Sequence, residues 1–358
     1  MMSAAQLFDP LTIRSIRLKN RVFVSPMCQY SCAADGLATS WHLMHLGRFA
    51  VGGAALVFTE ATAVSPVGRI SPHDLGLWSG AHVEALAPVA AFIRAQGAVA
   101  GIQLAHAGRK GSTATPWHGG AAVAPADGGW TPVAPSPIAF SSTYPEPAAL
   151  DSGDIAGIVD QFVLAAKRAE EAGFQVVELH MAHGYLLHEF LSPLSNRRTD
   201  AWGGDFEGRT RLPLAVVSAV RDAWPADRPL FVRISATDWS EGGWDLPQSI
   251  RFASHLRERG VDLVDCSSGG LVPDAKIPVG PGYQVPFARA IREEARMATS
   301  SVGMISEPVQ ANEIVASGSA DAVLLARGML RDPNWALHAA HALGVDVSWP
   351  VQYQRAKL

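Results

Sequence analysis

The stretch IAGIVDQFVLAAKRAEEAGFQVVELH, residues 155–180, holds the two patterns that decide the fold. Apolar side chains recur along one helical face at Ile155, Ile158, Val159, Phe162, Ala166 and Ala169. We expect Ser152 or Asp154 to cap the start of this helix and Gly173 to stop it. The run Val176–His180 follows at once and is interpreted as a buried strand. A helix that leads directly into a buried strand predicts a repeating α/β unit.

The same alternation extends along the chain in both directions. We expect eight strands, at Val22–Ser25, Ala55–Glu60, Val99–Leu104, Val176–His180, Leu230–Ile234, Leu263–Cys266, Ser301–Ile305 and Ala322–Ala326. Several of these runs are nearly all apolar, as strands covered on both faces are. Eight strands with helices between them favour one (β/α)8 TIM barrel over the whole chain, 1–358. An open doubly wound sheet is the weaker alternative, because no Gly-x-Gly-x-x-Gly turn follows an early strand.

The segment 111–150 breaks the alternation. It carries seven prolines and shows little periodicity. A structureless segment of this length is uncommon in a domain unless it is functional. Because it follows the third strand, we expect it to rise from the C-terminal rim and cap the barrel mouth as a loop or hairpin. A surface excursion without a role is the alternative.

Composition limits the class of protein. The net charge is −4 with acidic and basic residues intermixed, which gives no electrostatic case for binding nucleic acid or an anionic membrane. The three cysteines, Cys28, Cys32 and Cys266, form no Cys-x-x-Cys pair and no disulfide framework. Charges interrupt the N-terminal residues where a signal peptide needs an apolar core, and no long uncharged apolar stretch occurs. We therefore expect a cytoplasmic protein.

The chemically distinctive residues fall where the expected strands end, which is where barrels carry catalytic groups. They are Ser25 to Tyr30 after the first strand, Glu60 after the second, Gln103 to Lys110 after the third, His180 to Tyr185 after the fourth, Arg233 in the fifth and Arg327 after the eighth. This coincidence supports both the strand positions and an active site at that end.

The cluster His180-x-x-His183-x-Tyr185 is the most informative of these. Two imidazoles can donate hydrogen bonds to one substrate oxygen, and a tyrosine can then act as general acid. A metal site is the rival interpretation, with His106 or Glu60 as a third ligand. Two histidines satisfied within a polar network at the rim are a further alternative.

Two arginines indicate a bound anion. Arg233 and Arg327 lie at strand ends, and Arg327 with Gly303 matches the usual phosphate site of the last two loops of a barrel. Taken singly, each arginine is more often an ion-pair partner. Taken alone, Arg109 and Lys110 are interpreted as solvated charges of the rim, and Cys28 as a small buried side chain.

At this point several motifs match a known family in fixed order. These are Ser25-Pro-Met-Cys-Gln-Tyr30, Gln103-Leu-Ala-His-Ala-Gly-Arg-Lys110, His180-x-x-His183-Gly-Tyr185 and Asn196-Arg-Arg-Thr-Asp200-x-x-Gly-Gly204. The chain resembles the old yellow enzyme family of NADH:flavin oxidoreductases, and within it the cysteine-containing bacterial subgroup that includes the xenobiotic reductases. The resemblance runs from Leu7 to Arg355. Trp202, Asp205 and Gly208 depart from the usual pattern on a rim segment.

The resemblance implies FMN at the barrel mouth and assigns residues to it. The residues that would line or hold the cofactor are Ser25, Pro26, Met27, Cys28, Ala61, Gln103, Arg233, Gly303, Ala326 and Arg327. Among these, Gln103 would bond the pyrimidine edge and Arg233 would lie by N1 and the C2 oxygen. The substrate would be bound by Tyr30, Lys110, His180, His183 and Arg355. Tyr185 would be the catalytic proton donor, and Cys28 would tune the flavin.

The resemblance also implies a reaction. NAD(P)H would reduce FMN, and hydride would pass from flavin N5 to the β-carbon of an α,β-unsaturated carbonyl or nitro compound while Tyr185 protonates the α-carbon. In the similar subgroup an arginine near Arg355 reaches a neighbouring active site, which implies a homodimer or homotetramer; a frayed polar tail is the alternative. A metal-dependent barrel hydrolase or aldolase and a non-catalytic flavin sensor are the remaining alternatives. No metal site is expected.

Overall fold

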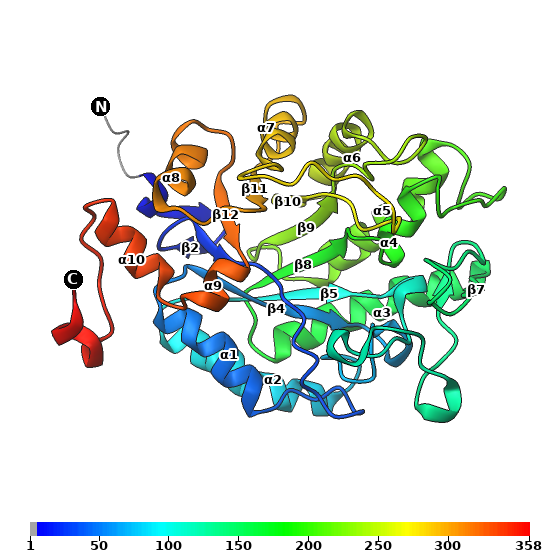
Figure 1. Ribbon diagram of the computed structural model, residues 1–358, viewed down its shortest axis with the longest axis horizontal. Coiled ribbons are helices and arrows are strands. Elements are labelled where there is room, and N and C mark those ends of the chain that lie inside the picture. The colour runs from blue at the N-terminus through cyan, green and yellow to red at the C-terminus, as the bar shows by residue number, and fades with distance from the viewer. Residues whose placement is uncertain (1–5) are drawn as a thin grey trace.

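Eight parallel strands close into a barrel in the computed structural model, which describes residues 6–358 (Figure 1). The strands are β3 (Val22–Val24), β4 (Leu56–Ala63), β5 (Val99–Ala105), β8 (Val176–Met181), β9 (Leu230–Ser235), β10 (Leu263–Ser267), β11 (Thr299–Val302) and β12 (Ala322–Leu325). They follow one another round the barrel in chain order, and β12 pairs with β3 to close it. The predicted barrel is confirmed and the open sheet is excluded. Residues 1–5 of the predicted domain lie outside the described residues.

Most of the helices lie on the outside of the barrel between consecutive strands, and the last two follow β12. They are α1 (Ser40–Val51), α2 (Gly80–Ala95), α3 (Ser152–Glu171), α4 (Leu186–Leu191), α5 (Phe206–Ala223), α6 (Leu246–Glu258), α7 (Val285–Glu294), α8 (Pro308–Ala316), α9 (Arg327–Arg331) and α10 (Trp335–Ala342). Among residues 6–358, none of these helices combines the length and apolar character needed to cross a membrane.

Helix α3 begins earlier than the sequence predicted. Asp151, rather than Ser152 or Asp154, is the N-cap, because its carboxylate accepts the Asp154 backbone N–H at 2.8 Å. Asp154 returns the contact to the Asp151 N–H at 3.0 Å, which completes a capping box. Gly173 lies just past the end of the helix with φ +89°, a conformation that favours glycine, so its predicted role as the stop is confirmed.

Two strands have different limits from those predicted. Strand β4 continues past Glu60 to Ala63, because its register against β5 shifts between Phe58 and Ala61 and then resumes. Glu60 therefore lies within the strand and not at its end. The strand predicted at Ser301–Ile305 was placed too late in the chain, because β11 runs from Thr299 to Val302. Strand β11 stops at Val302 because Gly303 and Met304 both adopt positive φ.

The N-terminal hairpin closes the lower end of the barrel. Strands β1 (Leu11–Ile13) and β2 (Ile16–Leu18) pair antiparallel, and their apolar side chains pack on the apolar cluster inside the barrel. A second and larger apolar cluster fills the space between the strands and the outer helices. Apolar side chains therefore fill the N-terminal end of the barrel interior, and the C-terminal end is left for polar side chains.

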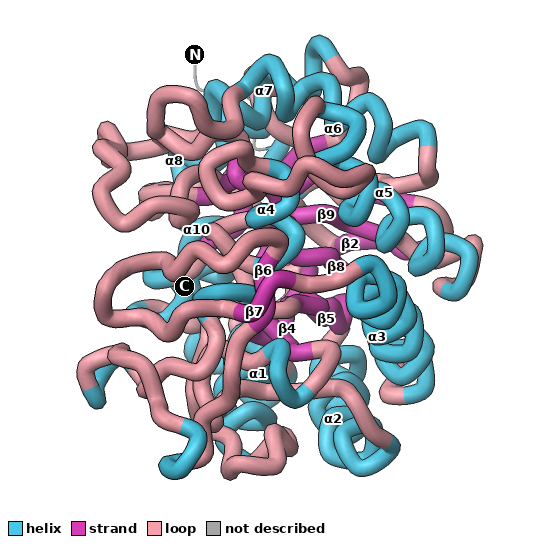
Figure 2. Tube along the Cα trace, turned by 90° about the vertical axis from the view of Figure 1, so that its right-hand side faces the viewer, coloured by secondary structure: helices cyan, strands magenta, loops and turns pink. Residues whose placement is uncertain are grey.

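The long connections gather at the other end, on the right of Figure 1, and Figure 2 looks onto that side. Within the segment 111–150, β6 (Val133–Ala134) pairs parallel with β7 (Ala148–Ala149). A β-hairpin has antiparallel strands, so these two strands do not form one. The segment is tied to the barrel through the Trp130 indole N–H, which donates to the Val67 carbonyl at 3.0 Å, and through the Thr113 N–H, which donates to the Ile70 carbonyl.

Candidate active site

Side chains of alternate strand residues fill the barrel in layers, because successive residues of a strand point to opposite faces. The lower layer is apolar and includes Val176, Phe231 and Leu263. Two residues further along the same strands the side chains are polar or charged: Glu178, Arg233 and Asp265. Two residues further again are His180, Ser235 and Ser267. The change from apolar to polar marks the C-terminal end as the place for chemistry.

Gln103, Glu178, Arg233 and Asp265, which we call the strand cluster, form two cross-strand pairs. Gln103 Nε2 donates to Glu178 Oε1 at 2.7 Å, and Arg233 Nε lies 3.0 Å from Asp265 Oδ2. Arg233 Nη1 also donates to Ser25 Oγ at 3.1 Å. Each cluster residue is at most 5% exposed. The structure therefore brings together three residues that the sequence predicted for one site, namely Ser25, Gln103 and Arg233.

Sequence reasoning missed the two carboxylates of this cluster. The available signal was a single acidic residue inside an otherwise apolar strand, as in Val-Val-Glu-Leu for Glu178 and Leu-Val-Asp-Cys for Asp265. Burial is the main cause that raises the pKa of Glu178 to about 8, and the negative charge of Asp265 adds to it. Burial likewise raises the pKa of Asp265, against the opposing effect of Arg233.

His180, His183 and Tyr185 converge as the sequence predicted. The His180 ring centroid lies 5.1 Å from that of His183 and 5.1 Å from that of Tyr185. His183 has φ +61°, and its ring Nε2 lies 2.7 Å from Ser267 Oγ. Burial first, and then the charge of Arg233, lowers the pKa of both histidines well below the usual value, so both are neutral at pH 7. The buried Nδ1 of His180 has no hydrogen-bond partner among residues 6–358.

The loop that carries these residues is supported from behind by a buried pair. His188 Nδ1 accepts the Gly184 N–H at 2.9 Å, and its Nε2 lies 2.9 Å from Asp238 Oδ1. Burial acts to raise the pKa of Asp238, but His188 and hydrogen-bond donors bring it below the usual value. This ionised carboxylate fixes the His188 ring and hence the backbone between His183 and Tyr185. The sequence analysis did not single out either residue of the pair.

Lys110 has a different environment from the one expected. Its ammonium donates to the backbone carbonyls of His183 and Gly270, both at 2.8 Å. Lys110 therefore joins the loop after β8 to the loop after β10, and it is not a freely solvated rim charge. The two loops are in close contact, since a Cβ added at Gly270 would lie 2.7 Å from His183 Cα. Burial lowers the pKa of Lys110 to about 8.

Arg109 is also not a solvated rim charge. It is 4% exposed, and its guanidinium donates to the carbonyl oxygens of Leu271 at 2.7 Å and of Ile138 at 3.3 Å. Its backbone N–H donates to Glu189 Oε1 at 2.9 Å. Arg109 thereby ties the end of the third barrel strand to the segment 111–150.

The loop from Ser25 to Tyr30 places a half-buried free thiol at the mouth. The Gln29 N–H donates to Glu60 Oε2 at 2.9 Å, which anchors the loop on β4. Tyr30 has φ +49°, a conformation that few residues other than glycine adopt. Burial raises the pKa of the Cys28 thiol well above the usual value, and nearby carboxylates add to the effect, so the thiol is neutral at pH 7. The ring of Trp117, from the segment 111–150, meets Tyr30 edge-on at 5.6 Å.

The third ligand that the metal interpretation required is not in place. His106 Nδ1 accepts the Gly108 N–H, and Glu60 faces His42 at 3.3 Å and not His180. Over residues 6–358, no three His, Cys, Asp or Glu side chains are grouped so that they could hold a metal ion.

Comparison with known proteins identifies the family. Residues 6–345 match the model of the NADH:flavin oxidoreductase / NADH oxidase family. The chain belongs to this family. It is 48% identical over 350 residues to an NADPH dehydrogenase of Geobacillus sp. (strain WCH70), covering 98% of each chain. It is 47% identical over 353 residues to an NADPH dehydrogenase of Bacillus subtilis (strain 168), covering 98% of this chain and 99% of the relative.

Similarity to solved structures supports the same family. Morphinone reductase is 29% identical with a TM-score of 0.79, over 98% of this chain and 92% of that chain. An old yellow enzyme homologue from Zymomonas mobilis is 25% identical with a TM-score of 0.77, over 97% of this chain and 95% of that chain. The predicted membership in the old yellow enzyme family is thus confirmed, together with the oxidoreductase class, the FMN cofactor and NAD(P)H as reductant.

The residues at the mouth of this old yellow enzyme family member fit FMN. Gly303 follows β11 with φ +117°, and Arg327 opens α9 directly after Ala326 at the end of β12. Arg327 is exposed, and among residues 6–358 its side chain forms no hydrogen bond or ion pair, which leaves the guanidinium free for a phosphate. Ala61 borders Gln103 across β4 and β5, so a small side chain lies beside the amide. Pro26 and Met27 are half-buried in the loop that follows β3.

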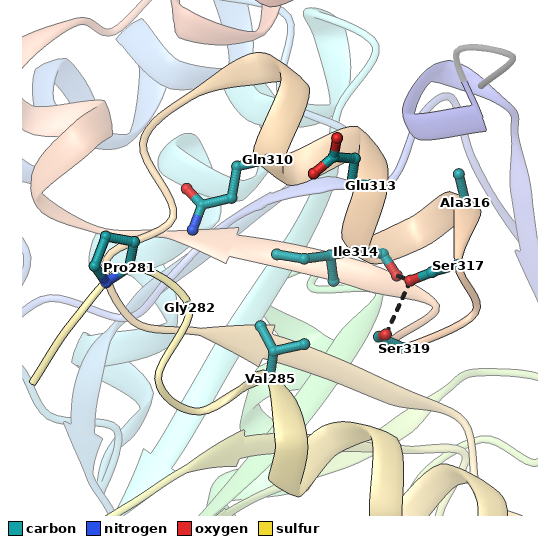
Figure 3. Close-up of a pocket in the computed structure, with 9 residues that line it drawn as sticks. All are labelled: Pro281, Gly282, Val285, Gln310, Glu313, Ile314, Ala316, Ser317 and Ser319. Atoms are coloured by element: carbon teal, nitrogen blue, oxygen red, sulfur yellow. Dashed lines mark hydrogen bonds between the residues drawn. The ribbon is translucent and has the colours of Figure 1, made fainter. Parts of the chain in front are cut away.

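Two features lie away from this mouth. Arg355 is exposed on a turn of 3-10 helix at Val351–Ala356, and Figure 1 shows this C-terminal segment on the opposite side of the molecule from the long loops. The structure does not bring Arg355 to the site of its own chain. Figure 3 shows a surface cavity between the start of α7 and α8, lined by residues such as Gln310 and Glu313. It contains none of the predicted site residues, so we do not assign the function to it.

Proposed function

We propose that this protein is an FMN-dependent ene-reductase that reduces the C=C bond of α,β-unsaturated carbonyl or nitro compounds with NAD(P)H. The observation that carries the proposal is the convergence of His180, His183 and Tyr185 above the strand cluster. The hydride chemistry belongs to bound FMN, with NAD(P)H as donor and the β-carbon of the alkene as acceptor. The protein's own residues bind, orient and protonate.

The cofactor would be held by two groups of residues. Gln103 and Arg233 would meet the pyrimidine edge, with the Arg233 guanidinium favouring negative charge there. Gly303, Ala326 and Arg327 would hold the phosphate at the usual place for a barrel. The loop from Ser25 through Pro26 and Met27 to Cys28, with Ala61 opposite, would line the flavin ring.

His180 and His183 would bind the carbonyl or nitro oxygen of the alkene. Their pKa values lie well below the usual range, so each donates as a neutral imidazole at pH 7. Such donors stabilise the negative charge that develops on the oxygen, and one of them is typically worth about 2.7–4 kcal/mol. Ser267 holds the His183 ring through its Nε2.

Tyr185 would give its proton to the α-carbon. Burial raises the pKa of its hydroxyl well above the usual value, so the proton is present at any working pH. Cys28 and Tyr30 would border the same space, with the Tyr30 ring against the substrate. Lys110 would act there through the His183 backbone that its ammonium holds.

We further propose that the whole chain is one FMN-binding domain, with the segment 111–150 as a cap over its mouth. The Tyr30–Trp117 contact and the Arg109–Ile138 hydrogen bond support this cap. Three free cysteines and the use of NAD(P)H support a cytoplasmic location.

Arg355 would serve a neighbouring subunit in a homodimer or homotetramer, since it is exposed and remote from the mouth of its own chain. Deleting residues 353–358 should then raise KM for the alkene while NADPH oxidation persists. Unchanged kinetics with the alkene would remove the cross-subunit role.

The test is anaerobic absorbance of the purified protein during addition of NADPH and then 2-cyclohexen-1-one. We expect a flavin band that bleaches with NADPH and returns with the enone. In Tyr185→Phe the bleaching should be unchanged and the return slowed by about 10²–10⁴-fold. A yellow protein that NADPH does not reduce would favour a flavin sensor. A colourless protein that does not take up FMN would return attention to a metal-dependent hydrolase or aldolase.

A further inference from the structure

The strand cluster contains two carboxyl groups but only one positively charged side chain. Glu178 and Asp265 supply two carboxyl groups, and Arg233 is the guanidinium between them, with Gln103 as a neutral amide. All four side chains come from neighbouring strands, with Gln103 paired to Glu178 and Asp265 paired to Arg233 in the sheet register. Asp265 alone compensates Arg233, so Glu178 is left to be either an uncompensated anion or a neutral acid.

The hydrogen bond between Glu178 and Gln103 determines which way the Gln103 side-chain amide is oriented. A carboxylate only accepts hydrogen bonds, so ionised Glu178 requires the Gln103 amide nitrogen on its side, as the 2.7 Å contact has it. The amide oxygen is then left for an N–H donor at the mouth. A protonated Glu178 can donate as well as accept, so it tolerates either direction. Its second oxygen, Oε2, is buried and has no hydrogen-bond partner among residues 6–358.

We propose that Glu178 is a positioning residue that adjusts how tightly the site holds reduced FMN relative to oxidised FMN, through the Gln103 amide and the net charge beside Arg233. This inference rests on the proposed cofactor site and goes beyond it, because no sequence motif or mechanistic step assigned a role to Glu178.

The charge of the reduced cofactor sets the direction of the expected pH dependence. Hydride brings two electrons and one proton to FMN, so the anionic reduced cofactor carries one more negative charge than the oxidised form. An ionised Glu178 repels that charge, and a neutral Glu178 does not. The groups that face Glu178 are Asp265 from β10, Arg233 from β9 and Gln103 from β5, and with them the pKa of Glu178 lies at about 8. Reduced FMN should therefore be held relatively less tightly as pH rises through that region.

The experiment compares Glu178→Gln with wild type. Both are loaded with FMN, and the midpoint potential of the bound cofactor is measured against a reference dye at pH 6, 7, 8 and 9. The amide mimics the neutral acid, so the two proteins should agree at pH 6. At pH 9 the variant should hold reduced FMN relatively tighter, on the order of tenfold, which for a two-electron couple is about 30 mV.

Glu189→Gln is the matched control. Burial also raises the pKa of Glu189 to about 8, but its carboxylate accepts the Arg109 N–H and makes no contact with Arg233 or Gln103. Its potential should follow wild type at every pH. The proposal is overturned if Glu178→Gln also follows wild type, or if Glu189→Gln shows the same divergence.

A second measurement covers the case in which Glu178→Gln does not fold. The measurement uses Glu189→Gln, which lacks the other buried carboxyl with a pKa of about 8. In this variant the infrared carbonyl band of protonated Glu178 should vanish with a midpoint near pH 8 and should respond to reduction of FMN. A band that titrates without responding to reduction contradicts the proposal, and so does the lack of any such band. Neither measurement uses an alkene, so a failure of ene-reductase activity would be a separate result.

Discussion

Arg233 and Lys110 are both cations at the C-terminal end of the barrel, and the protein holds them in different ways. Arg233 projects from a central strand and is paired with the buried carboxylate of Asp265. Lys110 projects from a loop and donates only to the backbone carbonyls of His183 and Gly270. The strand cluster is thus held by the sheet, whereas the rim loops are held by side chains that reach across them. Substitutions should therefore cost more folding free energy in the strand cluster than at the rim.

Arg233→Met should have the largest effect. It leaves Asp265 buried without its cation, and breaking a buried ion pair in this way costs about 3–5 kcal/mol. We expect a matching loss in the free energy of unfolding from urea denaturation, together with weakened FMN binding. Arg289→Met is the control, since Arg289 forms an exposed pair with Glu293 and its loss should leave the free energy of unfolding nearly unchanged. Equal losses in the two variants would mean that the buried pair of the strand cluster contributes no more to stability than an exposed ion pair.

His180→Ala should come next and should act on binding and rate. Removing one oxyanion donor typically costs about 10²–10³ in rate, or roughly 2.7–4 kcal/mol. We expect that loss in the reoxidation of the reduced enzyme by 2-cyclohexen-1-one, with a parallel loss of phenol binding followed by absorbance. The exposed His341→Ala should leave both unchanged. Intact phenol binding in His180→Ala would remove the oxyanion role.

Lys110→Met should have an intermediate effect. Two part-buried carbonyls lose their donor, and the cost of a fully buried unsatisfied group, about 1–3 kcal/mol, is the upper bound for each. The folded pKa of about 8 lies below the usual 10.5, so between these values the unfolded chain binds the extra proton and wild type gains stability as pH rises. The stability gap between variant and wild type should therefore widen above pH 8 in denaturation curves. Lys167→Met, at an exposed position, should show no such widening.

Trp117→Ala should have the smallest effect on the fold. The Trp117 side chain is 63% exposed and has Tyr30 as its edge-on partner, a contact worth about 0.5–1.5 kcal/mol. We expect KM for bulky enones to change by several fold relative to 2-cyclohexen-1-one, with Trp117→Phe retaining most of the wild-type ratio. An unchanged ratio in Trp117→Ala would indicate that the segment 111–150 does not border the substrate.

Much of the site was predictable because barrels place function at strand ends. His180 and Arg233 were found from their positions in short apolar runs, and small errors in strand limits did not matter for them. Glu60 shows where that reasoning stops, because the irregularity in β4 moved the strand end from Glu60 to Ala63. A register shift arises from hydrogen bonding between strands, which a single segment's pattern does not contain.

The sequence by itself determined the alternation of helices and strands, the order of the motifs and the family. These depend on local periodicity and on residue types at short spacing, which a chain carries without folding. Only the tertiary structure decided that Glu178 meets Gln103, that Asp265 meets Arg233, and that Lys110 holds two loops together. Such contacts join residues far apart in the chain, and they follow from the register of neighbouring strands and the close approach of loops.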